Sequence, residues 1–260
     1  MCNLTGIAFG EATLTQDLVA GRTVLEVGAL DVNGSLRPFV ESLGPARYVG
    51  VDISPGPRVD EVVDATDLID HFGADSFDLV ITTEMLEHVR DWRVVVHNLK
   101  GVISPGGHLV VTTRSIGFPY HGFPHDFWRY EPEDMQAIFA DFDIRSLEQD
   151  PAAPGVFMMA RKPERFSESS TAVDLFSIVS GRRQRTVSTR DLLLLRLAGP
   201  PSPEGRPRIR RARRGLRRAA TEFRRRVVSP IWRRLPGSTR SAVKHALGRG
   251  DRSEPRSRPG

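Results

Sequence analysis

Apolar runs of strand length alternate with helix-like segments through the first 160 residues of the chain. Each run is hydrophobic through its middle, as expected for parallel strands that are buried on both faces. The predicted strands span residues 23–28, 47–52, 61–64, 77–83, 108–113, 143–148 and 156–161. The predicted helices span residues 33–43, 87–103 and 132–139. This alternation predicts an α/β domain in which helices cover both faces of a mostly parallel, seven-stranded sheet.

The end of this pattern differs from its beginning. A turn with Pro and Gly at residues 151–155 separates the last two predicted strands, so we expect an antiparallel hairpin at the C-terminal end of the sheet. The domain then ends near Lys162 and is predicted to span residues 1–163. Residues 164–205 mix serine, apolar and arginine residues without a clear period, and we interpret them as a linker or irregular extension.

Residues 206–260 have a very different composition. They contain 19 Lys or Arg against 3 Asp or Glu, so the rest of the chain is net acidic although the whole carries a formal net charge of +5. Apolar residues recur every three or four positions among these arginines, which predicts an amphipathic helical or disordered basic tail. Such a tail suits an anionic membrane surface, nucleic acid is less favoured, and a solvated tail is the plain alternative.

Cysteine content and hydropathy bear on the cellular compartment of the protein. The single cysteine, Cys2, can form neither a disulfide framework nor a cysteine-based metal site. No apolar run approaches the roughly 20 residues that a membrane-spanning helix needs, and residues 1–10 lack the pattern of a secretory signal. We therefore expect a cytoplasmic protein, peripheral to a membrane where the basic tail binds one.

Acidic residues end or follow three of the predicted strands. Glu26 and Gly28 lie at the end of the first strand, Asp52 ends the second and Asp64 closes the third. The carboxyl ends of parallel strands meet at one edge of a sheet, where nucleotide-type ligands bind. A carboxylate there can accept hydrogen bonds from both ribose hydroxyls, and a glycine lets the ligand approach the backbone. Taken alone, a turn glycine and a strand-end acid also have a purely structural interpretation.

The order of further motifs resembles the class I S-adenosylmethionine-dependent methyltransferase superfamily. These motifs are Asp64-Ala65 and the segments FDLVI and SPGGHL. The resemblance implies a Rossmann-like methyltransferase fold with S-adenosylmethionine as cofactor. It places Glu26 near the methionine part of the cofactor, Asp52 at the ribose and Asp64 at the adenine. The other cofactor-binding residues that it implies are Gly28, Ala29, Ile53, Ala65 and Thr83.

The turn after the first strand departs from the family pattern E-x-G-x-G-x-G. From Glu26 the chain reads EVGALDVNG, so the second and third glycines are absent. S-adenosylmethionine has no pyrophosphate for the backbone to wrap, so fewer glycines suffice than in a dinucleotide site. The departure argues against NAD, and it keeps open a binding module that has lost its chemistry.

The segment TEMLEHV, residues 83–89, carries the candidate catalytic groups. If a helix begins there, Glu84, Glu87 and His88 lie at positions i, i+3 and i+4, with two carboxylates and an imidazole on one face. Methyl transfer to an alcohol requires that the hydroxyl lose its proton. His88 as a general base, or a divalent metal bound by all three residues, can each achieve this. A dipole-stabilising glutamate and a packed histidine form the third, purely structural interpretation.

The segment PHDFWRYEP lies on the loop after the fifth predicted strand, which reaches over the same pocket. Together with EMLEHV it resembles the ubiquinone-biosynthesis O-methyltransferases and, more loosely, RNA 3′-terminal 2′-O-methyltransferases. The resemblance implies a divalent metal ion with Glu84, Glu87, His88 and His125 as ligands. His121 is a nearby substitute for His125. Oxygen and nitrogen ligands without cysteine favour Mg²⁺, Mn²⁺ or Zn²⁺.

Aromatic residues alternate with Gly and Pro in this same loop. They can stack on a sugar or another ring, and Arg114 or Arg129 can meet a phosphate or carboxylate, although packing of the loop onto the sheet explains the aromatics equally well. We therefore expect O-methylation of a hydroxyl on a sugar, glycan or lipid-linked small-molecule acceptor. The alternatives are methylation of an RNA ribose 2′-hydroxyl and a non-catalytic S-adenosylmethionine-binding module.

Overall fold

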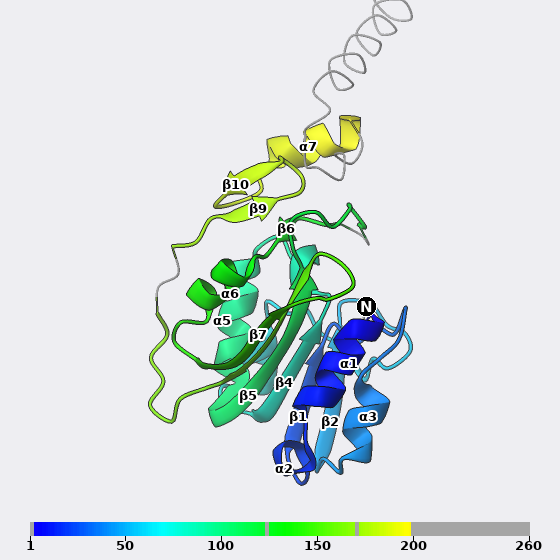
Figure 1. Ribbon diagram of the computed structural model, residues 1–260, viewed down its shortest axis with the longest axis vertical. Coiled ribbons are helices and arrows are strands. Elements are labelled where there is room, and N and C mark those ends of the chain that lie inside the picture. Colours follow the sequence, from blue (N-terminus) through cyan, green and yellow to red (C-terminus); the bar gives the residue numbers. More distant parts are fainter. Residues whose placement is uncertain (1–2, 123–124, 170–171, 199–260) are drawn as a thin grey trace, which may run out of the picture. The chain divides into compact units, whose positions relative to one another are not determined.

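The computed structural model describes residues 3–122, 125–169 and 172–198. In this part of the chain, seven strands form one sheet in the order β3-β2-β1-β4-β5-β8-β7 (Figure 1). The strands are β1 (Thr23–Val27), β2 (Arg47–Asp52), β3 (Glu61–Val62), β4 (Phe77–Thr83), β5 (Ile103–Arg114), β7 (Asp143–Gln149) and β8 (Gly155–Arg161). Each of the seven strands predicted from the sequence is present.

Strand direction in this sheet follows the prediction. β1 pairs in parallel with β2 and β4, β2 with β3, and β4 with β5. β8 runs antiparallel to both β5 and β7. The predicted α/β fold, with a mostly parallel seven-stranded sheet and a C-terminal antiparallel hairpin, is therefore confirmed. The carboxyl ends of the parallel strands share one edge, which positions the residues that follow them.

Helices cover both faces of the sheet and create two apolar cores (Figure 1). Because side chains alternate along a strand, Val80 points into one core while Leu79 and Ile81 point into the other. The helices are α1 (Leu4–Thr13), α2 (Gln16–Val19), α3 (Arg37–Ser42), α4 (Leu68–Phe72), α5 (Trp92–Val102) and α6 (Pro132–Ile138). α1 and α3 pack into the smaller core, and α4, α5 and α6 pack into the larger one.

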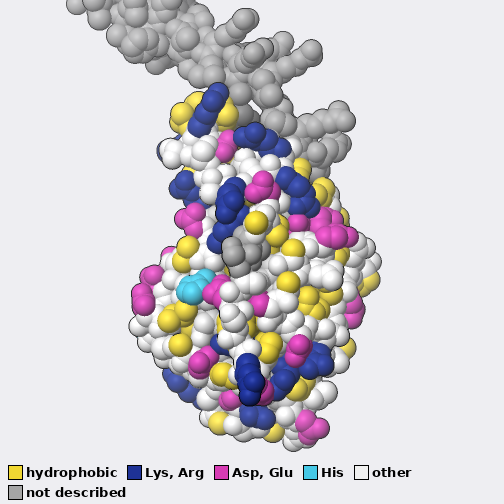
Figure 2. Space-filling view, turned by 90° about the vertical axis from the view of Figure 1, so that its left-hand side faces the viewer, with side chains coloured by type: hydrophobic (Ala, Val, Ile, Leu, Met, Phe, Trp, Pro, Cys, Tyr) yellow, Lys and Arg dark blue, Asp and Glu magenta, His cyan; other side chains and the backbone are white. Residues whose placement is uncertain are grey.

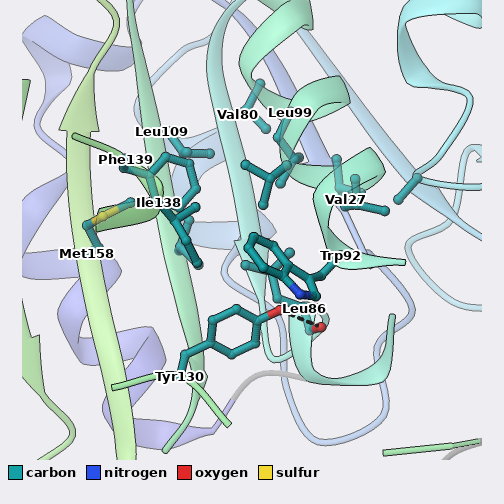
Figure 3. Close-up of a cluster of buried hydrophobic side chains, with 14 of the residues drawn as sticks. Val27, Val80, Leu86, Trp92, Leu99, Leu109, Tyr130, Ile138, Phe139 and Met158 are labelled. Atoms are coloured by element: carbon teal, nitrogen blue, oxygen red, sulfur yellow. Dashed lines mark hydrogen bonds between the residues drawn. The ribbon is translucent and has the colours of Figure 1, made fainter. Parts of the chain in front are cut away.

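The larger core extends to the turn after β4. Trp92 and Tyr130 are both buried there, with their rings edge to face at 6.4 Å between centroids. The Tyr130 hydroxyl donates a hydrogen bond to the Leu86 carbonyl at 3.2 Å (Figure 3). A core aromatic thus holds the backbone of the segment that carries the candidate catalytic residues.

The helix predicted over residues 87–103 begins later than expected. Residues Leu86–His88 form a single 3-10 turn, η1, Val89 is extended, and α5 starts only at Trp92. The Glu87 carbonyl accepts a hydrogen bond from the backbone N–H of Phe127 at 2.8 Å. Because this carbonyl is used by a distant loop, it is not available to an α-helix that starts at residue 87.

Part of residues 164–205, for which no fold was predicted, is ordered against the domain. β9 (Leu175–Ser177) pairs with β6 (Trp128–Arg129) and with β10 (Arg182–Gln184), which makes a small antiparallel sheet, and α7 (Thr189–Ala198) follows. Figure 1 shows this sheet next to the carboxyl edge of the main sheet. The predicted basic tail, residues 206–260, lies outside the described residues. No helix within the described ranges is long and apolar enough to cross a membrane.

Candidate active site

A cavity of about 340 Å³ lies at the carboxyl ends of the central strands, lined by the loops that follow β1, β2, β3 and β4. Five of the residues predicted to bind the cofactor line it: Gly28, Asp52, Ile53, Asp64 and Ala65. The sheet order places the Asp64 end of the cavity beyond β2 and the residues after β4 at its other end. The cavity therefore spans the positions at which the strand-end acids were predicted to act together.

Backbone amides orient the two carboxylates. Asp52 accepts hydrogen bonds from the N–H groups of Leu30 at 3.3 Å and Ser54 at 3.1 Å. Asp64 accepts from the N–H and the hydroxyl of Thr66 at 2.9 and 2.8 Å. Asp52 is half-buried and Asp64 is exposed, so both carboxylates keep acceptor capacity for a ligand in the cavity.

Gly28 is the glycine that the turn after β1 requires. Its φ is +84°, a left-handed conformation that side-chain-bearing residues rarely adopt. A Cβ atom at this position would lie 2.8 Å from the Cβ of Met85, which follows β4. The glycine therefore lets the loops after β1 and β4 approach each other, and the two glycines that the family pattern places further along are not needed for this contact.

The other residues predicted to bind the cofactor, Glu26, Ala29 and Thr83, are buried and do not line the cavity. Glu26 accepts a hydrogen bond from the Tyr48 hydroxyl at 2.7 Å. Burial, only partly offset by this bond, raises the pKa of Glu26 to about 7. The structure thus places the Glu26 side chain in the interior, where it bonds to Tyr48 of the neighbouring strand β2.

Beyond the cavity, three ionisable side chains converge in the interior. Glu87 Oε1 lies 3.9 Å from His88 Nε2 and 3.5 Å from His121 Nε2. The His88 and His121 rings meet edge to face at 4.8 Å. Glu87 is fully buried and the two histidines are partly buried. We call Glu87, His88 and His121 the histidine cluster. His88 also lines the cavity, so the cluster and the cavity meet at this residue.

A second layer of polar groups holds the cluster. His121 Nδ1 lies 3.0 Å from a carboxylate oxygen of Asp126, and the backbone N–H of His121 donates to that same oxygen. Arg129, which is fully buried, donates to Asp126 at 2.5 and 2.7 Å. On the opposite side, the Thr113 hydroxyl donates to Glu87 at 2.9 Å. The cluster is therefore fixed by β5 and by the loop that leads into β6.

These contacts set the protonation of the cluster. Burial lowers the pKa of His121, but hydrogen bonds with Asp126 and Glu87 outweigh it and raise this pKa to about 9. Burial raises the pKa of Glu87, yet its hydrogen bond with His121 and the charges of His88 and His121 hold it below the usual range. Similarly, hydrogen bonds from Arg129 and His121 overcome burial and hold the pKa of Asp126 well below normal.

The structure does not place Glu84 on one helix face with Glu87 and His88, as the sequence had suggested. Glu84 precedes η1, has a φ of +53°, and forms an ion pair with Arg114. Burial, followed by repulsion from Glu87, raises the pKa of Glu84 to about 8. Its Oε1 has no hydrogen-bond partner in the described part of the chain, and the residue lines the cavity. The left-handed backbone turns Glu84 toward the end of β5.

His125 also differs from its predicted place. Its side chain is exposed, and its ring lies 5.6 Å from that of Phe127. It reaches the cluster through its backbone, because its carbonyl accepts a hydrogen bond from His88 Nδ1 at 2.5 Å. This bond puts a proton on Nδ1 and leaves Nε2 of a neutral His88 as the basic nitrogen. The imidazole that joins Glu87 and His88 belongs to His121.

Comparison with known protein families shows which family the chain belongs to. A family model described as a methyltransferase domain matches residues 10–150, which is more than half of the chain. The chain belongs to this methyltransferase family. The predicted enzyme class, a methyltransferase, is thereby confirmed. A comparison with curated proteins found no match.

Solved structures share the fold. A putative S-adenosylmethionine-dependent methyltransferase from Listeria monocytogenes is 14% identical, with a TM-score of 0.50 over 61% of this chain and 97% of that one. A methyltransferase of the same kind from Mesorhizobium loti is 20% identical, with a TM-score of 0.47 over 60% and 96%. The 1,6-didemethyltoxoflavin-N1-methyltransferase of Burkholderia thailandensis, solved with S-adenosylhomocysteine, is 19% identical, with a TM-score of 0.48 over 61% and 78%. At these identities the likeness concerns the fold, and the acceptor has to be argued from the site.

The histidine cluster of this methyltransferase also has the composition of a metal site. One ligand atom from each of Glu87, His88 and His121 lies within 4.8 Å of the others. His88 Nε2 is buried and lacks a hydrogen-bond partner among the residues that the structure describes. Two imidazoles and a carboxylate are suitable ligands for a divalent ion, so the residues present fit one.

Sequence reasoning missed the groups that hold the methyltransferase site together over long distances in the chain. Arg90, which lines the cavity, donates to the Val187 carbonyl at 2.9 Å. The backbone N–H of Ile178 donates to the Phe127 carbonyl at 3.0 Å. No periodicity connects these positions. One available signal was the occurrence of His121, Asp126 and Arg129 together in a loop rich in aromatic, Gly and Pro residues, because buried charges need partners.

Proposed function

We propose that this methyltransferase transfers the methyl group of S-adenosylmethionine to a hydroxyl of a sugar, glycan or lipid-linked small molecule. The observation that carries the proposal is the histidine cluster, a buried set of basic and acidic groups at one end of the cavity. Transfer to a hydroxyl needs a group that removes or stabilises the negative charge of the oxygen, and the cluster offers such groups. Two of its members, Glu87 and His88, are among the four ligands that the resemblance to ubiquinone-biosynthesis O-methyltransferases implied.

The cavity would bind the donor along the strand ends. Asp52, the last residue of β2, is placed to hold the ribose hydroxyls, and Asp64, after β3, lies at the adenine end. The methionine part and the sulfonium then lie near Gly28 and Glu84, beyond which His88 begins the cluster. This orientation directs the transferable methyl group toward the histidines.

In the transfer step, the acceptor oxygen attacks the methyl carbon while the bond from that carbon to sulfur breaks. The sulfonium becomes the neutral thioether of S-adenosylhomocysteine, and the hydroxyl proton leaves to a base. His88 is placed to take this proton at Nε2, because its Nδ1 proton is held by the His125 carbonyl. His121, fixed by Asp126, would orient the acceptor oxygen from the other side.

Glu87, His88 and His121 are the residues that would hold a divalent metal ion. Such an ion lowers the pKa of a bound hydroxyl and stabilises its alkoxide. In that case the negative charge of the Glu87 carboxylate would offset part of the positive charge of the ion. The Thr113 hydroxyl orients this carboxylate through a hydrogen bond of 2.9 Å. Donor binding lies on the strand-end acids and does not require it.

The proposal is tested with the purified full chain, S-adenosylmethionine carrying a labelled methyl group, and acceptor fractions of free sugars, glycolipids and RNA. We expect label in a sugar or glycolipid fraction. Incorporation into RNA alone would contradict the proposal. His88→Ala should abolish transfer, whereas His97→Ala, on the exposed side of α5, serves as the matched control.

A chelation arm separates the two ways of activating the hydroxyl. If the histidine cluster works with a metal, exhaustive chelation abolishes transfer and leaves donor binding unchanged, and added Mg²⁺, Mn²⁺ or Zn²⁺ restores transfer. Full transfer after chelation, with His88→Ala inactive, would establish proton removal by the histidine alone.

A further inference from the structure

Helix α7 has leucines on two sides. Leu192 and Leu195 are partly buried and pack against the larger core. Leu193, Leu194 and Leu197 point away from it and are 56%, 40% and 48% exposed. Three large exposed apolar side chains within five positions are unusual on a helix that also packs on its domain, because exposed apolar residues are normally scattered.

This helix is attached to the domain at its beginning. The Ser188 hydroxyl and the Asp191 carboxylate lie 2.7 Å apart and cap its first turn. The carbonyl of Val187, directly before them, accepts two hydrogen bonds from the Arg90 guanidinium. β10, which leads into the helix, is tied by the ion pair of Arg183 with Asp134 at 2.6 Å. The exposed leucines therefore belong to a surface in a defined place on the enzyme.

Arginines are frequent in the segment that carries these leucines. Residues 182–197 contain five arginines and one acidic residue. Within the described ranges, four of these arginines, Arg182, Arg185, Arg190 and Arg196, are exposed and have no ion-pair partner. Figure 2 shows Lys and Arg side chains gathered over this end of the molecule, with hydrophobic side chains among them. We call these four arginines together with Leu193, Leu194 and Leu197 the α7 surface.

We propose that the α7 surface docks the enzyme on a lipid bilayer that contains anionic lipids. Leucines that insert at the boundary of headgroups and acyl chains, with arginines reaching lipid phosphates beside them, are the chemistry of an interfacial helix. An RNA partner would use the arginines but leave the leucines exposed to water. A second copy of the chain would bring two sets of unpaired arginines together, which like charges oppose.

A fluorescent label tests whether the leucines enter the bilayer. The full chain carries Cys2→Ser, so that its only native thiol is removed, and Leu193→Cys labelled with an environment-sensitive nitrobenzoxadiazole dye. With phosphatidylcholine vesicles that contain phosphatidylglycerol, we expect the emission to rise and shift to shorter wavelength. The same dye at Asp17→Cys, an exposed position of α2 at the other end of the sheet, should not respond (Figure 1).

A matched pair of triple variants measures the contribution of the leucines to binding. Leu193→Ser, Leu194→Ser and Leu197→Ser together should weaken vesicle partitioning by at least about tenfold. Leu4→Ser, Val62→Ser and Val94→Ser remove three other exposed apolar side chains and should leave it unchanged. Thermal unfolding and S-adenosylmethionine binding of both variants check that the fold is intact.

Three results would overturn the proposal. The first is vesicle binding with no response of the dye at position 193 and equal partitioning of the two triple variants, which would assign the binding to other parts of the chain. The second is a dye response that depends on protein concentration without vesicles, which would show a second copy on the α7 surface. The third is a dye response to RNA and none to vesicles.

Discussion

We call the cavity, which we propose to bind the methyl donor, the donor cavity. It lies beside the histidine cluster, but the two use charged groups in opposite ways. In the cavity, Asp52 and Asp64 remain accessible, each follows its own strand, and nearby backbone amides orient it. In the cluster, Glu87 is fully buried, the two histidines are partly buried, and the three depend on partners from β5 and from the loop before β6. An accessible carboxylate costs little to maintain, whereas a buried one has to be compensated.

This difference indicates which part of this methyltransferase tolerates single substitutions better. A cavity built from independent strand ends loses one contact when one residue is replaced. Around the cluster, Asp126 joins Arg129 and His121, and His121 joins Glu87, so the loss of one side chain leaves each of its neighbours with one partner fewer in the protein interior. We therefore expect larger effects from single substitutions in the cluster than in the cavity.

The largest expected effect separates two histidines of one loop. His121→Ala removes the imidazole that contacts Glu87 and Asp126, and should lower transfer by at least about a hundredfold, the scale of a lost catalytic group. His125→Ala keeps the backbone carbonyl that holds His88, and should retain most of the activity. Steady-state transfer rates of the two variants measure the contrast. The opposite result would restore His125 as the residue that completes the cluster.

A second effect comes from the buried acid behind the cavity. The pKa of Glu26 is raised from 4.5 to about 7, so between these pH values the folded protein keeps a proton that the unfolded chain releases. The contribution of this site to the free energy of unfolding is therefore fully present below pH 4.5. It falls by about 3 kcal/mol as the pH rises to about 7.

Glu26→Gln should remove this dependence and, above pH 7, unfold at higher denaturant concentration than the wild type. Urea titrations between pH 4.5 and 8 measure it, with Glu11→Gln, an exposed residue of α1, as the control. Parallel pH profiles for the wild type and Glu26→Gln would show that the buried acid is ionised throughout.

A third effect tests the contact between the loops after β1 and β4. Gly28→Ala combines a left-handed backbone with a Cβ at 2.8 Å from that of Met85, and should cost about 2 to 4 kcal/mol of unfolding free energy. Gly44 has a similar φ of +78° but nothing within 4 Å of an added Cβ, so Gly44→Ala should cost only about 1 kcal/mol. Equal losses in chemical denaturation would show that the Met85 contact is not restrictive.

The smallest effect is expected at an independent strand end. Asp52→Ala should weaken S-adenosylmethionine binding by more than about tenfold and leave the fold intact, because it removes a hydrogen-bonded charge from the ribose position. Calorimetry measures the affinity, and Asp70→Ala, an exposed acid of α4, is the matched control. Equal affinities of wild type and Asp52→Ala would remove Asp52 from the donor site.

The positions of the strands could be predicted because the strands buried in the sheet are apolar through their middle and each strand-end residue is next to its strand in the sequence. Helices were predicted less well, for physical reasons that differ between them. α1 carries its apolar residues all around rather than in one stripe, so no amphipathic period marks it. α5 starts late because the Glu87 carbonyl is bound by the Phe127 amide, a contact 40 positions away along the chain.

The choice between His121 and His125 was beyond sequence reasoning for a similar reason. Both lie in an irregular loop, where no helical or strand period sets the direction of a side chain. Asp126 decides between them, because the same carboxylate oxygen contacts both the backbone N–H and the ring of His121. This arrangement requires Asp126 to be buried with Arg129, which depends on the whole loop being folded.

The pairing of β6 with β9 has a consequence for the order in which the enzyme matures on the ribosome. All but one of the residues that line the donor cavity lie before position 92, and most of the sheet that supports them is synthesised soon afterwards. The loop that carries His121 and Asp126 is held by the hydrogen bond from Ile178, which directly follows β9, and Arg90 can form its hydrogen bond only after Val187 has been synthesised. A growing chain therefore contains nearly all the residues of this cavity well before the segment that holds the loop of His121 in place has been synthesised.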